Sequence, residues 1–220
     1  MSAPRHVAHL ARPVALVCLM ALASTSWAGR PLTVDDANVA EVGGGQLESW
    51  YSRPASRDKL WTTAFGVGVL DGLELGGAVE RDFSGPATAT ALQAKLRLTP
   101  SREGGCNIGA VVGRAHFNRG GGQATYVNGL FTCNIEGGPL HVNLGANRAD
   151  GGPTLKTWGA AKEFELGDVT AHVELFGQQH AKPTLQFGLR REVVKNVQVD
   201  GTLGRSDGKA VFSVGVRVGW

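Results

Sequence analysis

The sequence contains no apolar run long enough to cross a lipid bilayer as a helix, which takes about 20 residues. Its longest apolar stretch covers only residues 14–23. Arg5 and Arg12 precede this stretch, and Ser26-Trp27-Ala28 follows it with small residues at the −3 and −1 positions. This arrangement is typical of a cleaved secretory signal peptide. We therefore predict that residues 1–28 are removed and that the exported chain begins at Gly29.

The exported part also lacks a strong excess of charge of either sign. Residues 29–220 contain 20 Lys+Arg against 19 Asp+Glu, and the basic side chains are scattered along the chain. Proteins that bind nucleic acid gather their basic residues into a patch or stripe. Nucleic acid is therefore not an expected partner.

Sequence motifs for catalysis, metal binding and phosphate binding are missing as well. The sequence has no Gly-x-Ser-x-Gly elbow, since Ser213 has Val211 where the first glycine is required. The four histidines after residue 28 fall on different predicted strands or loops and lack metal-ligand spacing. The glycine runs 43–45 and 120–122 precede no predicted helix, as a phosphate loop would. We expect no organic cofactor, nucleotide or metal.

No exported segment has a helical period over ten or more residues, whereas strict alternation recurs throughout. In residues 60–70, for example, Trp61 and Phe65 alternate with Thr62 and Ala64. Alternation of this kind is typical of a β-strand with one apolar and one polar or small face. Tight-turn sequences such as Asp71-Gly72 separate the segments. Twelve strands are predicted, over residues 46–53, 60–70, 73–81, 88–99, 106–117, 124–135, 140–148, 154–166, 169–178, 184–191, 197–205 and 209–220.

Glycine is unusually abundant in the exported chain. All 32 glycines follow residue 28, so they make up about 17% of the exported chain, against about 7% in ordinary proteins. They lie inside the alternating segments or in turns and form no collagen repeat. In a β-barrel wall, glycine permits close packing, curvature and bulges.

The last strand ends the chain on an aromatic residue. Phe212, Val214, Val216, Val218 and Trp220 occupy alternate positions. The pattern formed by Ser213, Gly215, Val218 and Trp220 resembles the C-terminal β-signal of bacterial outer-membrane barrels. That resemblance implies location in the outer membrane, contact with its lipid, and recognition of this strand by the barrel-assembly machinery.

These observations predict an all-β protein, a single antiparallel up-and-down transmembrane β-barrel. Such a barrel has an even number of strands, and a strand of about ten residues is long enough to cross the membrane. We favour about twelve strands, and ten or fourteen would also fit. The loops are short on both sides, and with periplasmic termini the six polar loops such as 54–59 face outside. A soluble β-sandwich would alternate as well, but it needs no terminal aromatic. Residues 45–220 form the predicted barrel.

Residues 29–44 lack alternation and are predicted to be a periplasmic N-terminal lead-in. Over about twenty residues this opening resembles small proteobacterial transporter barrels of the phenol-degradation type. The resemblance implies a role in transport.

The two cysteines after residue 28, Cys106 and Cys133, test the predicted strand register. A hairpin centred on Arg119-Gly120 places Cys106 opposite Cys133 and Ile108 opposite Phe131, all on one apolar face. Directly opposed residues are about 4.5–5.5 Å apart, within disulfide range. Since an oxidising compartment favours disulfides, we predict a cross-strand disulfide at the periplasmic end.

The polar face of the strands supplies candidate pore-lining residues of both charge signs. We expect Glu74 and Glu80 to lie near Lys95 and Arg97, and Asp200 near Arg190 and Arg217. Such a lining indicates either mutually neutralising pairs or a pore with charge selectivity. The candidates are Glu74, Glu80, Lys95, Arg97, His141, His172, Glu174, Arg190, Asp200 and Arg217.

Three functions follow from this fold. The polar lining and the transporter resemblance favour a passive or narrow-selectivity channel for small solutes. A lipid-modifying enzyme at the barrel rim is the first alternative; His116 lies near the predicted outer rim, but no serine is placed opposite it. A non-conducting structural or interaction barrel is the second.

Overall fold

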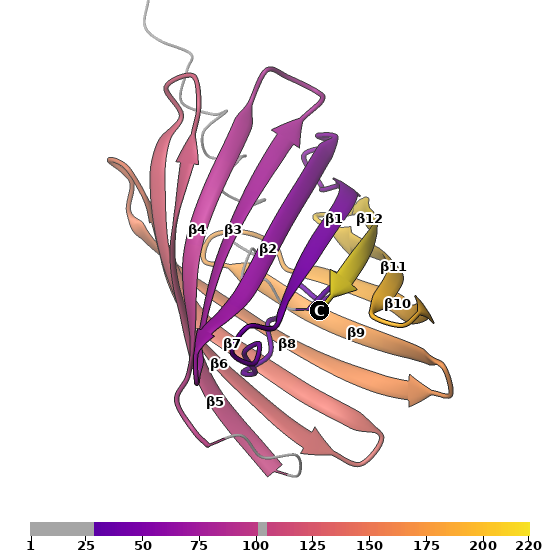
Figure 1. The fold of residues 1–220 in the computed structure, drawn as a ribbon. Helices are drawn as coiled ribbons and strands as arrows, with labels where there is room; N and C mark the ends of the chain where they lie inside the picture. The colour runs from indigo at the N-terminus through magenta and orange to yellow at the C-terminus, as the bar shows by residue number, and fades with distance from the viewer. Residues whose placement is uncertain (1–28, 101–104) are drawn as a thin grey trace, which may run out of the picture.

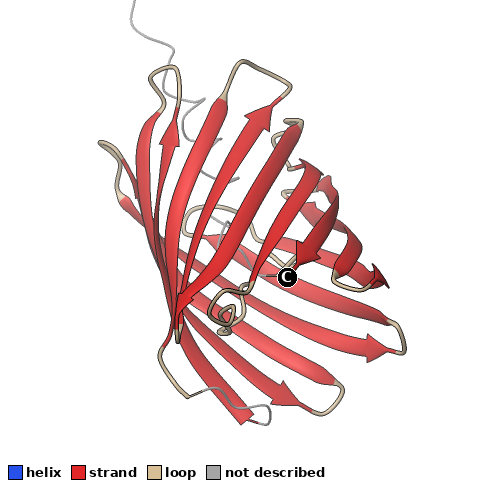
Figure 2. Cartoon of the chain, viewed as in Figure 1, coloured by secondary structure: helices blue, strands red, loops and turns tan. Residues whose placement is uncertain are grey.

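The computed structural model describes residues 29–100 and 105–220 of the chain. The predicted signal peptide, residues 1–28, lies outside the described residues. The described part consists of strands and loops (Figure 2), and it contains no helix long and apolar enough to cross a membrane.

Twelve strands form a closed barrel in the described ranges (Figure 1). Each strand pairs antiparallel with its sequence neighbours, and β1 pairs with β12 to close the ring. The predicted twelve-strand up-and-down barrel is confirmed. The strands are β1 (Gly45–Arg53), β2 (Leu60–Leu70), β3 (Leu73–Asp82), β4 (Thr88–Arg97), β5 (Gly105–Phe117), β6 (Gly122–Ile135), β7 (Gly138–Ala149), β8 (Thr154–Leu166), β9 (Val169–Gln178), β10 (Thr184–Val194), β11 (Val197–Ser206) and β12 (Lys209–Gly219).

The outer surface of the barrel is apolar on all sides. In β2, Trp61 and Phe65 point outward and are nearly half exposed, while Thr62 and Ala64 point inward and are buried. Each of the twelve strands contributes at least one exposed large apolar side chain. Soluble proteins rarely expose continuous apolar surface of this extent, because water solvates it poorly. The surface therefore suits the hydrocarbon interior of a bilayer.

The register of the β5–β6 hairpin agrees with the sequence prediction. Cys106 lies opposite Cys133 and Ile108 opposite Phe131. The two cysteines form a disulfide, with their Cα atoms 4.0 Å apart. The predicted disulfide is confirmed.

The two ends of the barrel differ in their connections. The end that carries Trp220, here the C-terminal end, has tight turns such as Asp71-Gly72, where Gly72 adopts a positive φ of 76°. The opposite end, here the loop end, carries six connections that include residues 54–59 and 179–183. The last hairpin pairs Leu203 with Phe212 in its loop-end half, and Leu203 is exposed on the outer surface.

Residues 30–40, here called the inner segment, lie inside the ring of strands (Figure 1). Val34, Asp35 and Ala37 are at most 1% exposed. We expected residues 29–44 to be a periplasmic lead-in, but the structure lays most of this stretch against the inner wall. Its polar and small residues hydrogen-bond to the wall, which a local sequence pattern does not reveal.

Candidate functional site

The inner segment contacts the wall strand by strand in a continuous course. It starts against Asp200 and Ser213 and ends with Ala40 beside Gly68; just beyond it, Val42 forms a parallel bridge with Gly68. Between these points it meets the inward faces of β10 to β3 in reverse chain order. Its contacts are Gln186, Glu174, Gly159, Asn143, Thr132, Asn107, Lys95 and Glu74.

Three wall glutamates hold the segment by its backbone. Glu48 accepts a hydrogen bond from the Arg30 amide at 3.0 Å. Glu174 Oε2 accepts from the amides of Thr33 and Val34 at 2.8 and 2.9 Å. Glu74 accepts from the Ala40 amide at 2.9 Å. Because a buried amide without a partner is costly, each carboxylate fixes one point along the segment.

Neutral wall groups bond further backbone groups of the segment. Asn143 accepts from the Asp35 amide at 2.7 Å and donates to the Asp35 carbonyl at 2.8 Å. Thr132 Oγ1 accepts from the Ala37 amide at 2.9 Å. A single amide side chain thus satisfies both backbone groups of Asp35, as a neighbouring strand would.

Ion pairs anchor both halves of the segment. Lys95 Nζ lies 2.8 Å from Asp35 Oδ1 and 3.5 Å from Asp36 Oδ1. The Arg30 guanidinium bonds Asp200 and lies 4.8 Å from the Trp50 ring centroid. Charges buried in a protein interior must be paired to be tolerated, so these pairs make the docked position specific.

Apolar packing adds two smaller contacts. Leu32 and Val34 pack with Ala161 and Phe176, and Ala37 packs with Val111 and Leu130. A Cβ atom on Gly159 would lie 2.7 Å from Val34 Cγ2, closer than packed atoms allow. Glycine is therefore required at this point of β8 for the segment to approach the wall.

The lumen is filled at the level of the inner segment. The wall residues predicted from their inward position are almost inaccessible there: Lys95 is 3% exposed and Glu174 1%. In an open, water-filled pore these side chains would keep accessible surface. The segment therefore fills the lumen at this level.

The predicted pore-lining residues lie on the inner wall, but their ion partners differ from those expected. Lys95 is the register neighbour of Glu74, yet it pairs with Asp35. Asp200 is the register neighbour of Arg190, yet it pairs with Arg30. The expected proximity is confirmed for these two neighbours, but the ion pairs are made with the inner segment, whose contacts the sequence did not indicate.

The remaining predicted residues make other contacts. Arg190 pairs with Glu163, which also bonds His141 Nε2 at 3.0 Å. His172 Nε2 lies 3.6 Å from Glu174. At the C-terminal end, Arg97 pairs with Asp71 at 2.6 Å and Arg217 donates to Gln46 at 2.7 Å; toward the loop end, Glu80 accepts from Thr62 at 3.1 Å.

Part of the lumen toward the loop end is apolar, which sequence reasoning missed. Phe117 is buried against a cluster of inward-facing alanines, and Trp50 packs on the same cluster. Nearby, Tyr126 donates to Gln93 at 3.0 Å. Small residues on an inward face give no polar signal, so alternation alone did not single them out. The alanines are Ala64, Ala89, Ala91, Ala115 and Ala124.

The predicted assembly residues face two ways. Val218 and Trp220 point outward and are exposed, Trp220 by 59%. Ser213 and Gly215 face the lumen beside Arg30, with Ser213 Oγ 3.3 Å from the guanidinium. Recognition of this strand by the assembly machinery stays a prediction.

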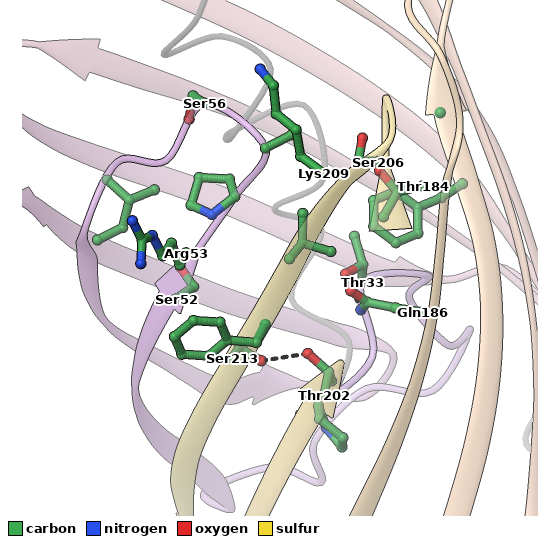
Figure 3. A pocket seen from close by; sticks show the side chains of 18 of the residues that line it. Thr33, Ser52, Arg53, Ser56, Thr184, Gln186, Thr202, Ser206, Lys209 and Ser213 are labelled. Carbon is green, nitrogen blue, oxygen red and sulfur yellow. Dashed lines mark hydrogen bonds between the residues drawn. The ribbon is translucent and has the colours of Figure 1, made fainter. Parts of the chain in front are cut away.

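A pocket of about 640 Å³ lies between the inner segment and the loop end, here called the loop-end pocket. Arg30, Leu32 and Thr33 line its inner side, while Arg53 and Lys209 lie at the ends of strands. Figure 3 shows Ser56, Ser206 and Lys209 toward one end, and Thr33, Gln186, Thr202 and Ser213 toward the other. Its size lies within the range of small-molecule sites, about 300–1,000 Å³.

Two loops meet at the mouth of the loop-end pocket. Lys182 Nζ lies 2.8 Å from Asp207 Oδ1. Their hydrogen bond and charge attraction raise the pKa of the Lys182 ammonium and lower the pKa of the Asp207 carboxyl. This pair joins the β9–β10 loop to the β11–β12 turn at neutral pH.

The alternative of a lipid-modifying enzyme at the barrel rim requires a serine beside His116, and the described part of the structure places none there. His116 faces outward, and its register neighbours are Thr90 and Gln123. A nucleophile and base need hydrogen-bond contact. The arrangement of the described residues therefore does not favour the enzyme alternative.

Comparison with known proteins places the chain among barrels of the same architecture. The KdgM porin superposes with a TM-score of 0.63 at 14% identity, covering 80% of this chain and 99% of that one. The KdgM porin in complex with disordered oligogalacturonate gives 0.64 at the same identity and coverage. The COG4313 outer membrane channel from Pseudomonas putida F1 gives 0.64 at 10% identity, covering 84% and 98%. The fold is that of outer-membrane porins.

Sequence comparison gives a family but no curated relative. The family described as uncharacterised conserved protein UCP029691 matches residues 15–216. No curated protein matches the sequence.

Proposed function

The chain belongs to the UCP029691 family, and we propose that it is a passive outer-membrane channel for small solutes, closed in this conformation by its inner segment. The observation that carries the proposal is a polar inner wall surrounding a segment of the chain's own N-terminal part, with a pocket on the loop-end side. A twelve-strand barrel is wider than the filled eight-strand kind and narrower than a sixteen-strand porin. It has room for either a segment or a solute.

The contacts of the inner segment suit reversible docking. Most of them are hydrogen bonds from backbone amides to wall carboxylates, amides and hydroxyls. Exchanging such bonds for bonds to water has a modest net free-energy cost, about 0.5–1.5 kcal/mol for each bond to a neutral group and about 1.5–3 kcal/mol for each bond to a carboxylate. Pro31, Leu32, Val34 and Ala37 are its buried apolar side chains. The segment is therefore held by bonds that water can replace.

Release of the segment would expose a charged lining. Glu74, Glu174, Lys95 and Asp200 would each lose a partner and face the lumen. These are residues predicted from sequence to line the pore, and their mixed charge suits small hydrophilic solutes. The structural neighbours include a porin bound to oligogalacturonate, a hydrophilic solute of that protein, and this supports the same broad class here.

The outer-membrane setting supports an assembly role for the last strand. β12 closes the barrel against β1, and the Trp220 amide donates to the Gly45 carbonyl at 3.1 Å. We include in the proposal that the assembly machinery reads Ser213, Gly215, Val218 and Trp220. An assembled barrel would then present Trp220 to lipid.

The channel proposal can be tested by locking the segment to the wall. A Cβ atom placed on Gly159 would lie 3.7 Å from Val34 Cβ, within the 3.5–4.5 Å typical of disulfides. The variant V34C/G159C, refolded into planar bilayers, should therefore stay closed when oxidised and show discrete conductance steps after reduction. Wild type with the same reductant controls for loss of the native Cys106–Cys133 bond.

Two further observations complete the test. Neither single variant, V34C or G159C, should change its conductance on reduction more than wild type does. G159C, whose Cβ crowds Val34, should conduct at least as well as wild type under both conditions. Equal conductance of the oxidised and reduced double variant would show that the segment does not close the path. Absence of conductance from wild type and every variant would overturn the channel itself.

A further inference from the structure

Charged side chains of both signs line the loop-end pocket, and some of them form ion pairs with other residues of the chain. Lys182 pairs with Asp207, and Arg30 pairs with Asp200. These pairs leave other charged side chains on the pocket wall. They are Arg53, Lys209, Glu48 and Glu80.

The two remaining cations lie toward the mouth. Arg53 ends β1 and Lys209 begins β12, and these strands are paired. Within residues 29–100 and 105–220, neither side chain lies within 4.0 Å of an acidic group. Both are exposed. They can therefore receive a carboxylate that enters from the loop end.

A carboxylate lies deeper on a neighbouring part of the wall. Glu80 on β3 accepts a hydrogen bond from Thr62 at 3.1 Å, a neutral donor. It also borders a smaller cavity of about 20 Å³ together with Asp58 and Asp82. A partly buried carboxylate without a cation is costly, and an ammonium group would remove that cost. Glu48, the other acid, is occupied by the Arg30 amide.

The strand register gives the depth of Glu80 relative to Arg53. Glu80 lies level with Thr62 and, across β1, with Trp50. Arg53 lies three positions beyond Trp50, about 10 Å along the strand, and β3 lies two strands from β1, about 10 Å across the sheet, so the backbone positions of Glu80 and Arg53 are about 14 Å apart. An extended dipeptide spans roughly 7 Å, and a hydrogen bond at each end adds about 2.9 Å. A single amino acid is shorter than this separation.

The rest of the pocket wall suits a peptide backbone. Ser52, Ser56, Thr184 and Ser206 bring hydroxyl groups to the space between the mouth and the inner segment (Figure 3). Hydroxyls both donate and accept hydrogen bonds. They can therefore bond the amide and carbonyl of a bound peptide.

We propose that the loop-end pocket binds a short zwitterionic peptide, with its ammonium group at Glu80 and its carboxylate at Arg53 and Lys209. The peptide would enter with its ammonium group ahead and stop above Arg30 of the inner segment. This names a solute class for the channel and so rests on the proposed function. Binding is nevertheless measurable in the refolded full chain without any conductance.

The test compares three probes of similar size by isothermal titration calorimetry. They are Ala-Ala, which is zwitterionic, N-acetyl-Ala-Ala, an anion, and Ala-Ala-amide, a cation. We expect Ala-Ala to bind at least about tenfold more tightly than either capped form, because each capped form loses one charge contact worth about 1.4 kcal/mol or more.

Variants assign each end of the probe. E80Q should weaken Ala-Ala and Ala-Ala-amide about tenfold but leave N-acetyl-Ala-Ala unchanged or tighter. The variant R53Q/K209Q should weaken Ala-Ala and N-acetyl-Ala-Ala but not the amide. Matched controls are Glu165→Gln and Lys59→Gln, exposed charges outside the pocket wall, and they should change nothing.

Three results would overturn the proposal. One is binding of N-acetyl-Ala-Ala as tightly as Ala-Ala, which would indicate an anion site. Another is binding of Ala-Ala-amide as tightly as Ala-Ala, which would indicate a cation site. The last is no binding of any probe to a folded barrel that conducts, which would remove the peptide site and leave the channel standing.

Discussion

Lys95 on β4 and Asp35 in the inner segment form an ion pair of 2.8 Å, and their side chains are 4% and 0% exposed. The pair joins a barrel strand to a residue 60 positions earlier in the chain. Loss of either partner should be costly, because a lone charge cannot remain buried at low cost.

Replacing Lys95 with methionine should release the inner segment. Removing one member of a buried pair costs about 3–5 kcal/mol, enough to shift the docked population more than about a hundredfold. We expect higher conductance in bilayers and faster proteolysis between residues 29 and 44. Lys195→Met, in an exposed turn, is the control. Wild-type protection of the segment in K95M would argue against this anchor.

Substituting Gly159 with valine should also displace the segment. The new Cβ would lie 2.7 Å from Val34 Cγ2, so the two side chains cannot both keep their places. We expect the same proteolytic sensitivity as in K95M, with the barrel still folded by circular dichroism. Shortening the opposing side chain in G159A/V34A should restore protection relative to G159A alone. Failure of that rescue would place the effect in the β8 strand itself.

Loss of the disulfide should lower stability without changing the fold. Cys106 and Cys133 are 27 residues apart, and closing a loop of that size stabilises by about 2–4 kcal/mol. Since the hairpin register is also fixed by backbone pairing, C106S/C133S should assemble but unfold at lower urea concentration in lipid vesicles. An unchanged urea midpoint would show that strand pairing alone holds the hairpin.

Deleting Trp220 should impair assembly. Its amide and carbonyl both pair with Gly45, at 3.1 and 3.2 Å, and its ring is exposed toward lipid. We expect periplasmic degradation and loss of heat-modifiable migration on gels. Trp61→Ala, an exposed tryptophan on β2, serves as the control for losing one aromatic from the outer surface. Normal assembly of the truncated chain would count against an assembly signal.

Residue alternation predicted most of the barrel wall because inner and outer faces meet different surroundings at every second position. The ranges 60–70, 154–166 and 169–178 agree with the observed strands to the residue. The Cys106–Cys133 pairing followed from hairpin symmetry, since both strands leave one tight loop. Ends of strands such as β10, which continues to Val194, were less well predicted because exposed rim residues no longer alternate.

The candidate site was predicted only in part. The inward position of Lys95, Glu174 and Asp200 followed from alternation, but their partners did not, because those partners come from a non-repeating segment distant in sequence. Gly159 looked like one more wall glycine. Its specific role requires knowing that Val34 lies against it.

The sequence by itself determined the wall: its alternating segments, its apolar outer face and its disulfide, since each depends on neighbours in the chain and on period-2 geometry. The tertiary structure decided what occupies the lumen. Asp35 meets Lys95, and Arg30 meets Asp200, only because barrel closure brings distant strands around the same space. Long-range contacts of this kind leave no periodic signal, so they emerge only once the ring is closed.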